Sequence, residues 1–482
     1  MSFPEETQAA RTAQVSWAAL PLKRRLESVA RLRTLLVERR DALTAAMLAD
    51  AERQPAETLA TDVMPSASAC KYLLTDAKRI LKDRVADRTP LWLMGSNDVV
   101  LRRPHGVVGI IGTWNYPLFL NLVPIVHALT AGNGVLWKPS ENSVQLAVVL
   151  NDLFREAGYP AGLVQTLPAT RDGGPMLAEA DIDFLHFTGS EAVGRKLASR
   201  LGERLIPSVL ELSGVDACIV MPDTDIPLAA RSAWYGLTLN KGQTCLAVRR
   251  IFVHADVAET FCDELRKHAA KSGPMRVLKE SQVEQAERLL AEAVGLNTIA
   301  APGTPGDREF SPTVILNASP KLGVCNEAIF APLAALMTFR TVEELIALND
   351  ECKFGLGCSL FSDGKFADGR MLVPRLKVGV VTGDDVIAGT AHPATPLAGR
   401  GRAGWGATQG NEGLLAMTVP QVISVRSGFF RPHIDAALNP HPGDAGLLEG
   451  MLSFTHGRGL RERARGLVQM IRGIMATRKR DH

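Results

Sequence analysis

From about residue 12 to residue 82, apolar side chains recur at the spacing of an α-helix. Positions three or four residues apart share one helix face, and arginines and glutamates occupy the opposite face of this region. We therefore predict a run of helices at the start of the chain. The positions that define the apolar face are Trp17, Leu20, Leu26, Val29, Leu32, Leu35 and Leu36.

Short apolar runs then alternate with helical patterns. A strand at 99–102 leads into a buried strand at 106–112, and helical patterns at 123–130 and 143–157 flank a short buried strand at 134–137. Strands that alternate with helices as far as about residue 212 are typical of a parallel sheet with crossover helices.

A second alternation follows residue 245. It predicts a strand at 250–254, a helix at 257–270, a strand at 313–316 and a helix at 342–348. Two such alternations in succession favour an α/β chain in which a cofactor domain precedes a catalytic domain.

The end of the chain shows a third pattern, a helix with one apolar stripe among arginines. A basic amphipathic helix of this kind can lie on an anionic membrane surface, and it can equally dock on the protein itself or on a second subunit. Both interpretations stay open here. The stripe, within about 460–480, consists of Leu460, Ala464, Leu467, Val468, Ile471, Ile474 and Met475.

Composition narrows the class of protein. A chain of 482 residues with 46% hydrophobic and 22% charged residues predicts an α/β enzyme of two or three packed units. A net charge of +3 gives no reason to expect nucleic acid as a partner. The seven cysteines show no metal-ligand spacing, and neither a signal-peptide core nor a membrane-spanning run is visible. We expect reduced thiols, no metal and a cytoplasmic location.

Three segments carry candidate chemistry. Cys245 ends the run Asn-Lys-Gly-Gln-Thr-Cys, Glu211 lies in Val-Leu-Glu-Leu-Ser-Gly, and Asn115 lies in Gly-Thr-Trp-Asn-Tyr-Pro. A thiol can attack a carbonyl, an amide N–H can stabilise the oxyanion, and a carboxylate can activate water. Each residue also has an ordinary structural alternative: a buried apolar cysteine, a salt-bridged glutamate and a turn asparagine.

These segments resemble the aldehyde dehydrogenase superfamily, and Thr113 in the third resembles its class 3-like branch of fatty and aromatic aldehyde dehydrogenases. The resemblance runs from about residue 10 to about residue 426. It implies Cys245 as nucleophile, Glu211 as general base, and Asn115 with the Cys245 N–H as oxyanion donors.

The resemblance also implies a domain organisation. A Rossmann-like NAD-binding domain would occupy 1–210, with an oligomerisation β-hairpin near 84–104, and an α/β catalytic domain would occupy 211–395. The segment 396–426 would return to the bridging, oligomerising element, and 427–482 would be an extension that carries the basic amphipathic helix. The resemblance also implies a homodimer. A peripheral contact with a membrane, if the protein makes one, would involve the last helix.

The resemblance also implies which residues bind the cofactor. Lys138 and Glu141 would bind the adenosine ribose, and NAD is the expected cofactor because Glu141 should repel the 2′-phosphate of NADP, although NADP stays open. A loop leading into a helix would meet the phosphates. The residues implied in cofactor binding are Lys138, Glu141, Thr188, Gly189, Ser190, Gly194, Phe330 and Trp114.

Some positions depart from the family pattern. Ala328 stands where the family has a glutamate that holds the nicotinamide ribose, and Glu327 is one residue away and should point elsewhere. The expected function is NAD(P)-dependent oxidation of an apolar aldehyde, long-chain aliphatic or aromatic, to the carboxylic acid through a cysteine thioester. The alternatives are a CoA-acylating aldehyde dehydrogenase and a non-catalytic binding or scaffold protein derived from the family.

Overall fold

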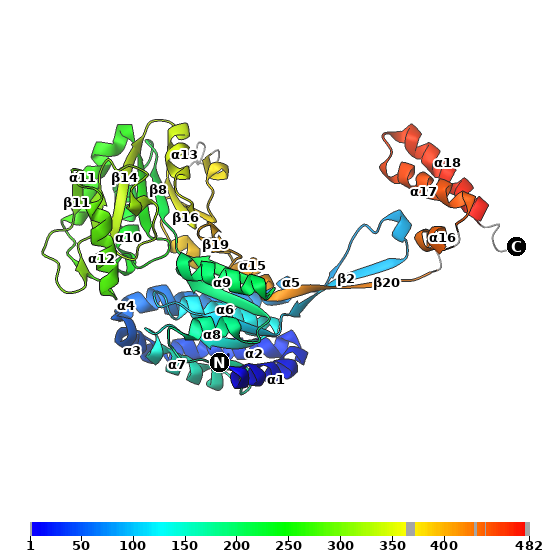
Figure 1. Ribbon diagram of the computed structural model, residues 1–482, viewed down its shortest axis with the longest axis horizontal. Coiled ribbons are helices and arrows are strands. Elements are labelled where there is room, and N and C mark those ends of the chain that lie inside the picture. The colour runs from blue at the N-terminus through cyan, green and yellow to red at the C-terminus, as the bar shows by residue number, and fades with distance from the viewer. Residues whose placement is uncertain (1, 363–371, 429–430, 439, 478–482) are drawn as a thin grey trace. The chain divides into compact units, whose positions relative to one another are not determined.

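A computed structural model describes residues 2–362, 372–428, 431–438 and 440–477 of the chain (Figure 1). Within these residues the chain forms two compact units. The larger unit comprises 1–80 and 104–419, and the smaller comprises 81–103 and 420–482. The larger unit contains both of the expected α/β sheets.

The N-terminal region is helical, as the apolar periodicity predicts. Trp17, Val29, Leu32 and Leu36 are buried, whereas Leu20 lies just beyond a helix end and is exposed. The elements are α1 (Pro4–Ala19), α2 (Leu22–Glu38), α3 (Arg40–Ala51), α4 (Pro55–Thr58), the π-helical turn η1 (Leu59–Val63) and α5 (Met64–Ile80).

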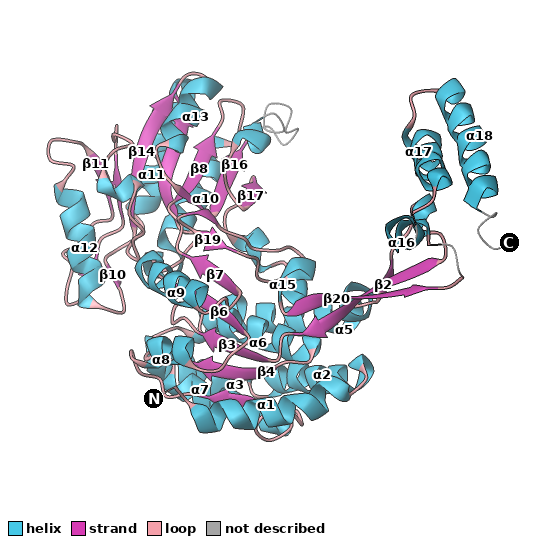
Figure 2. Cartoon of the chain, turned by 45° about the vertical axis from the view of Figure 1, so that its right-hand side comes forward, coloured by secondary structure: helices cyan, strands magenta, loops and turns pink. Residues whose placement is uncertain are grey.

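The first sheet has the strand order β19-β7-β6-β3-β4-β5, with helices packed on it (Figure 2). Neighbouring strands are parallel except at the β19 edge. The strands are β3 (Val107–Ile111), β4 (Gly134–Lys138), β5 (Val164–Thr166), β6 (Phe184–Gly189), β7 (Ser208–Leu212) and β19 (Gly404–Trp405). The helices between them are α6 (Phe119–Ala131), α7 (Val144–Glu156), α8 (Gly173–Glu179) and α9 (Glu191–Glu203).

The direction of strand succession reverses between β3 and β6. From β3 the chain continues through β4 to β5 on one side, and β6 and β7 lie on the other side. Ligands of parallel α/β sheets bind at the carboxyl ends of the strands at such a reversal. The loop with Trp114 and Asn115 follows β3, and the turn into α9 follows β6, so both lie at this point.

The second sheet has the order β11-β13-β14-β9-β8-β16-β17 and is parallel except at β11. Along β9, Phe252 packs in one apolar cluster and its neighbours Ile251 and Val253 in another, so both faces of the sheet are covered. The strands are β8 (Asp216–Val220), β9 (Val248–His254), β11 (Thr298–Ala300), β13 (Thr313–Ile315), β14 (Leu333–Phe339), β16 (Gly357–Phe361) and β17 (Val380–Gly383). The helices are α10 (Ile226–Thr238), α11 (Ala258–Ala269), α12 (Glu280–Ala291) and α13 (Val342–Asp350).

The predicted α/β class, with one parallel sheet following the other, is confirmed. The expected boundary after residue 210 falls inside β7, because the pairing of β7 with β6 continues to Leu212. Shorter elements complete the larger unit. They are the pairs β10 (Met275–Arg276) with β12 (Glu309–Phe310) and β15 (Phe354–Gly355) with β18 (Arg400–Gly401), and the helix α15 (Gly410–Ala416).

The smaller unit consists of a sheet and a group of helices. β1 (Arg84–Val85) pairs antiparallel with β2 (Ser96–Pro104), and β20 (Thr418–Arg426) lies next to β2. The helices are α16 (Pro432–Leu438), α17 (Pro442–His456) and α18 (Leu460–Thr477). α18 confirms the predicted C-terminal helix as far as Thr477, and the predicted residues 478–480 lie outside the described part. Among the described residues, the helices fall short of the length and apolarity that crossing a bilayer requires.

Candidate active site

A sharp turn precedes Cys245. After α10, Asn240, Lys241 and Gly242 adopt left-handed backbone conformations with φ of 50°, 60° and 76°. A Cβ added to Gly242 would lie 2.6 Å from the backbone of Ala331 and Pro332, so a larger residue does not fit there. The turn predicted from the Gly-Gln-Thr sequence is thereby confirmed.

A buried arginine, which the sequence analysis did not single out, ties this turn to the neighbouring chain. The Arg249 guanidinium donates to the carbonyl of Gly242 and to those of Ile329 and Ala331, at 2.8 and 2.6 Å. Burial lowers the pKa of Arg249 to about 9. Because backbone carbonyls accept from its N–H groups, Arg249 fixes the loop before Cys245.

Asn115 follows β3 and lies against the same loop. Its amide Nδ2 donates to the Gln243 carbonyl at 3.1 Å, and its Oδ1 accepts from the Thr113 hydroxyl at 2.8 Å. The Asn115 carbonyl accepts from Arg53 and, at 2.9 Å, from Asn240 Nδ2. The Asn115 side chain is therefore held in one orientation against Gln243, which lies two residues before Cys245 in the chain.

Arg53 itself is fixed by a buried ion pair with Asp62, at 3.1 Å. Asp62 also accepts from the backbone N–H groups of Leu118 and Phe119, at 3.2 and 3.1 Å. The two charges thus hold both ends of the segment that contains Asn115. Their role was missed because Arg53 and Asp62 occur in a stretch of sequence without a distinctive motif, and the backbone groups that they hold are more than fifty residues away.

Glu211 and Cys245 interact across the site. Glu211 lies on β7, paired in register with Thr188 on β6, and is 3% exposed. Burial raises the pKa of Glu211 to about 7, and the Thr188 and Cys245 side chains act in the opposite direction. Burial, together with Glu211 and Asp216, holds the pKa of the Cys245 thiol well above its usual value. The thiol is therefore protonated in this state and must lose its proton before it can attack a carbonyl.

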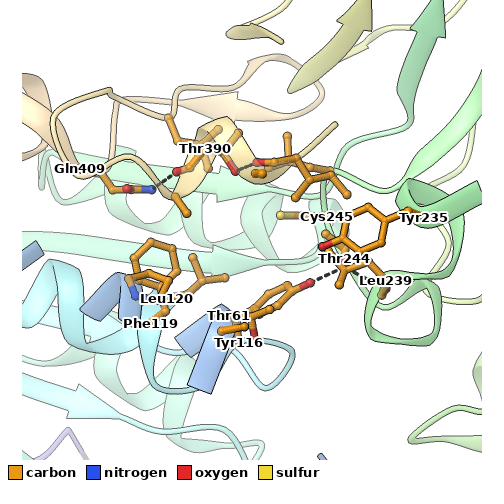
Figure 3. Close-up of a pocket in the computed structure, with 17 residues that line it drawn as sticks. Thr61, Tyr116, Phe119, Leu120, Tyr235, Leu239, Thr244, Cys245, Thr390 and Gln409 are labelled. Atoms are coloured by element: carbon orange, nitrogen blue, oxygen red, sulfur yellow. Dashed lines mark hydrogen bonds between the residues drawn. The ribbon is translucent and has the colours of Figure 1, made fainter. Parts of the chain in front are cut away.

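Cys245 lies in the wall of an apolar cavity of about 210 Å³, into which Figure 3 shows its sulfur pointing. A hydrogen bond of 2.5 Å between the hydroxyls of Tyr116 and Thr244 closes one side. Among the described residues, those that line the cavity carry no formal charge. The larger apolar ones are Tyr116, Phe119, Leu120, Tyr235, Leu239, Leu246, Ile387 and Leu397.

Glu211 faces a second, much smaller cavity, which also borders His186, Thr188, Thr408 and Gln409. It offers about 10 Å³ to the centre of a water molecule, which is room for about one water. Both carboxylate oxygens of Glu211, both ring nitrogens of His186 and Oε1 of Gln409 are buried without a protein partner. Buried polar atoms of this kind are normally satisfied by water, so the cavity suits an ordered water beside Glu211.

The cofactor candidates gather at the carboxyl ends of the first sheet. Lys138 ends β4, and its Nζ lies 3.3 Å from Glu141 Oε1. Thr188 and Gly189 end β6, and the Ser190 hydroxyl caps α9 by accepting from the backbone N–H of Val193 at 3.5 Å.

Three further cofactor candidates, Gly194, Trp114 and Phe330, lie near this edge. A Cβ on Gly194 would lie 2.6 Å from Leu212, so the first turn of α9 packs closely on the sheet. The rings of Trp114 and Phe330 lie 5.7 Å apart. Trp114 follows β3 at the reversal, and its contact with Phe330 joins the two sheet regions of the larger unit.

Comparison with known proteins identifies the family to which the chain belongs. Residues 3–423 match the model of the aldehyde dehydrogenase family. The chain belongs to this family. It is therefore an oxidoreductase that acts on aldehydes.

Curated relatives of this aldehyde dehydrogenase differ in the substrates that they are named for. It is 30% identical to the 4,4'-diapolycopene aldehyde oxidase of a Methylomonas species, over 86% of this chain and 80% of the relative. It is 31% identical to an NAD⁺-dependent benzaldehyde dehydrogenase of Pseudomonas putida, over 83% of each. A putative NADP⁺-dependent succinate-semialdehyde dehydrogenase of Mycobacterium tuberculosis is 30% identical, over 87% of this chain and 83% of that one.

Solved structures agree on the fold of this aldehyde dehydrogenase. A Mycobacterium tuberculosis aldehyde dehydrogenase in complex with NAD⁺ superposes with a TM-score of 0.82 at 26% identity, over 88% of this chain and 90% of that one. A putative aldehyde dehydrogenase from Burkholderia cenocepacia gives 0.81 at 26% identity, over 87% and 88%.

Two further features concern the positions that depart from the family pattern and the end of the chain. Glu327 forms an ion pair of 2.5 Å with Arg288 on α12, and the Ala328 carbonyl accepts from Gln285 on the same helix at 3.2 Å. The family match also ends at residue 423, so the helices α16, α17 and α18 lie beyond it.

Proposed function

We propose that this protein oxidises an apolar aldehyde to the carboxylic acid through a thioester on Cys245, with NAD as cofactor. The observation that carries the proposal is the position of Cys245 in the wall of an uncharged cavity, with Glu211 near enough to raise the pKa of its thiol. A nucleophile, a base and an apolar binding space are the parts that such a reaction needs.

The first step is the attack of the Cys245 sulfur on the aldehyde carbonyl carbon. The thiol loses its proton to bulk water as the sulfur attacks, and Glu211, whose pKa of about 7 suits a base at neutral pH, is kept for the later hydrolysis. Asn115 donates one amide hydrogen to Gln243 and turns the second toward the developing oxyanion, together with the Cys245 backbone N–H. Because Arg53 and Asn240 hold the Asn115 backbone, this donor is in position before the substrate arrives.

The dinucleotide would bind at the carboxyl edge of the first sheet, where it would supply the hydride acceptor needed to oxidise the adduct on Cys245 to a thioester. Lys138 and Glu141 offer polar groups to the adenosine ribose, and the capped N-terminus of α9 offers N–H groups to the phosphates. We assign NAD rather than NADP as the preferred cofactor because a 2′-phosphate would meet the Glu141 carboxylate.

Hydrolysis of the thioester uses Glu211 as the base. A water held in the small cavity by His186 and Gln409 would lie where Glu211 can take its proton. The water oxygen bonds to the acyl carbon, the carbon–sulfur bond breaks with its electron pair on sulfur, and the carboxylic acid leaves. Burial lowers the pKa of His186 to about 3, so this ring stays neutral and can both donate to and accept from water.

The cavity favours apolar substrates. Relatives are named for a diapolycopene aldehyde, benzaldehyde and succinate semialdehyde, and the last of these carries a carboxylate. A carboxylate buried in this cavity would lack a cationic partner among its described lining residues and would lose its hydration. We therefore assign long-chain aliphatic or aromatic aldehydes.

A steady-state assay of NADH production tests the proposal. We expect kcat/KM for benzaldehyde and decanal to exceed that for succinate semialdehyde by at least about a hundredfold, since the latter buries an unpaired charge. Equal or greater efficiency with succinate semialdehyde would overturn the substrate assignment. Thioester formation from coenzyme A in the same assay would instead support the CoA-acylating alternative, and no turnover with any aldehyde would support a non-catalytic role.

We also propose a homodimer. The β20 strand exposes β-branched apolar side chains, Val419, Ile423 and Val425 on one face and Val422 on the other, between 39% and 61% of their surface. An exposed apolar strand at the edge of a sheet is a surface that a second copy of the chain can cover. A peripheral contact of α18 with a membrane completes the proposal.

A further inference from the structure

The two last helices pack through glycines. On α17, Gly443 and Gly450 are seven residues apart, and on α18, Gly466 and Gly473 repeat that interval. A Cβ on Gly450 would lie 2.7 Å from Met470 Cα, and one on Gly473 would lie 2.5 Å from Leu447 N. The backbones of α17 and α18 are therefore closer together than larger side chains would allow, as at the small-residue contacts of helices in lipid.

This packing leaves the large apolar residues of α18 on its other side. At 100° per residue, Gly466 and Gly473 point almost opposite to the arc from Leu467 through Ile471 to Val468. Leu467, Val468 and Ile471 are 38%, 48% and 41% exposed, and Met475 is 63% exposed. Leu447 and Met451 of α17 are both 5% exposed, so the apolar residues that the hairpin buries come from the other helix.

Arginines border this arc. Arg461, Arg465 and Arg472 follow Val468 around the helix on one side, and Arg463 lies on the other, all with exposed side chains. Glu462 is the acidic residue of the described helix α18. A second copy docked face to face would bring like charges together, whereas an anionic lipid surface would meet them with opposite charge and accept the apolar arc.

We propose that the arc Leu467, Val468, Ile471 and Met475, with the arginines beside it, binds the surface of an anionic lipid bilayer, and that α17 is the platform that turns this arc outward. The proposal deepens the membrane contact given above by naming its partner, its face and its mode of packing. It stands on the helical hairpin alone. Only the further link, delivery of membrane-dissolved aldehydes to the enzyme, rests on the proposed function.

Co-sedimentation of the full chain with vesicles tests the proposal. We expect binding to vesicles of phosphatidylcholine with phosphatidylglycerol at low salt, and at least about tenfold weaker binding to pure phosphatidylcholine or at high salt, because each arginine contributes about fivefold near an anionic surface. Absence of binding to the anionic vesicles, or equal binding to both kinds, would overturn the proposal.

Two variants test the face itself. Val468→Gln with Ile471→Gln should weaken binding by about tenfold or more, since two apolar side chains lose their favourable transfer. Leu452→Gln is the matched control, because Leu452 is 63% exposed on α17 and points away from α18. Binding by Leu452→Gln should stay within about twofold of the unchanged chain. An equal loss in both would overturn the assignment of the face.

Two further measurements distinguish lipid binding from dimerisation through the arc, and from the proposed aldehyde oxidation. Light scattering without lipid should give the same molar mass for the double variant and the unchanged chain, and a halved mass in the variant would assign the arc to a second copy and overturn the proposal. NADH production from benzaldehyde in lipid-free buffer should be equal in the two. If the unchanged chain binds vesicles but oxidises no aldehyde, the lipid proposal stands and the proposed function fails.

Discussion

The cavity at Cys245 and the outer face of α18 are both apolar surfaces, but their charges are arranged in opposite ways. The cavity is a recess, and its described lining is free of charged side chains. The α18 face is exposed and bordered by arginines. A recessed uncharged surface suits a small apolar molecule, whereas an open apolar surface with a basic border suits a lipid layer. The position of the charges, rather than apolarity itself, distinguishes the two roles.

The two surfaces also differ in how the chain builds them. The cavity draws on residues as distant as Thr61, Tyr116, Cys245 and Gln409, and buried polar side chains such as Arg249 fix their backbone. The α18 face comes from one helix, within nine residues of sequence. Substitutions in the cavity should therefore lower the rate of aldehyde oxidation, whereas substitutions on the α18 face should leave that rate unchanged.

The largest expected effect comes from removing the nucleophile. Cys245→Ala should lower steady-state oxidation by at least about a thousandfold, because no thioester can form. NAD binding, measured by fluorescence titration, should persist because Lys138 and Glu141 lie on another segment. Cys262→Ala is a matched control outside the cavity and should leave activity unchanged. Activity of Cys245→Ala within tenfold of the unchanged enzyme would remove the nucleophile assignment.

The next effect separates the two half-reactions. Glu211→Gln should still give a first burst of NADH, while its steady rate falls by about a hundredfold or more, since a general base contributes in that range. Equal losses in burst and steady rate would show that Glu211 does not act specifically in hydrolysis.

The pH dependence should identify the same group. Because the raised pKa of about 7 keeps Glu211 protonated in acid, the steady rate of the unchanged enzyme should rise as pH increases through about 7 and then level off. A stopped-flow and steady-state pH series on the unchanged enzyme and on Glu211→Gln measures this. Persistence of the same rise in Glu211→Gln would assign it to another group.

The smallest effect concerns Ala328, which stands where the family has a glutamate that binds the nicotinamide ribose. Ala328→Glu should tighten NAD binding by about tenfold, because a charged hydrogen bond to a ribose hydroxyl contributes about 1.5–3 kcal/mol. Glu327→Ala, which breaks only the ion pair with Arg288, serves as the control and should leave the Kd for NAD unchanged. An unchanged Kd in Ala328→Glu would mean that the loop follows a different path from the cofactor.

Local sequence patterns predicted the elements whose signal is local. The parallel strands β3, β4 and β9 and the helix α18 followed from apolar periodicity, and Cys245, Glu211 and Asn115 stood out because each lies in a distinctive short run. Their assigned roles remain predictions, whereas their proximity is a property of the structure.

The remaining features depend on contacts between distant segments. Arg53, Arg249 and His186 have no distinctive local context, and their importance comes from partners that only the fold brings near. The helix α17 was missing from the sequence prediction because its glycines weaken helix propensity, and its close packing on α18 compensates for them.

The central claim, a thioester on Cys245 resolved by Glu211, is tested most directly by the intact mass of Glu211→Gln after mixing with NAD⁺ and benzaldehyde. We expect a mass increase equal to one benzoyl group, mapped to Cys245 by peptide analysis and absent when Cys245 is also replaced by alanine. A burst of NADH without any acyl adduct, or an adduct on another residue, would contradict it.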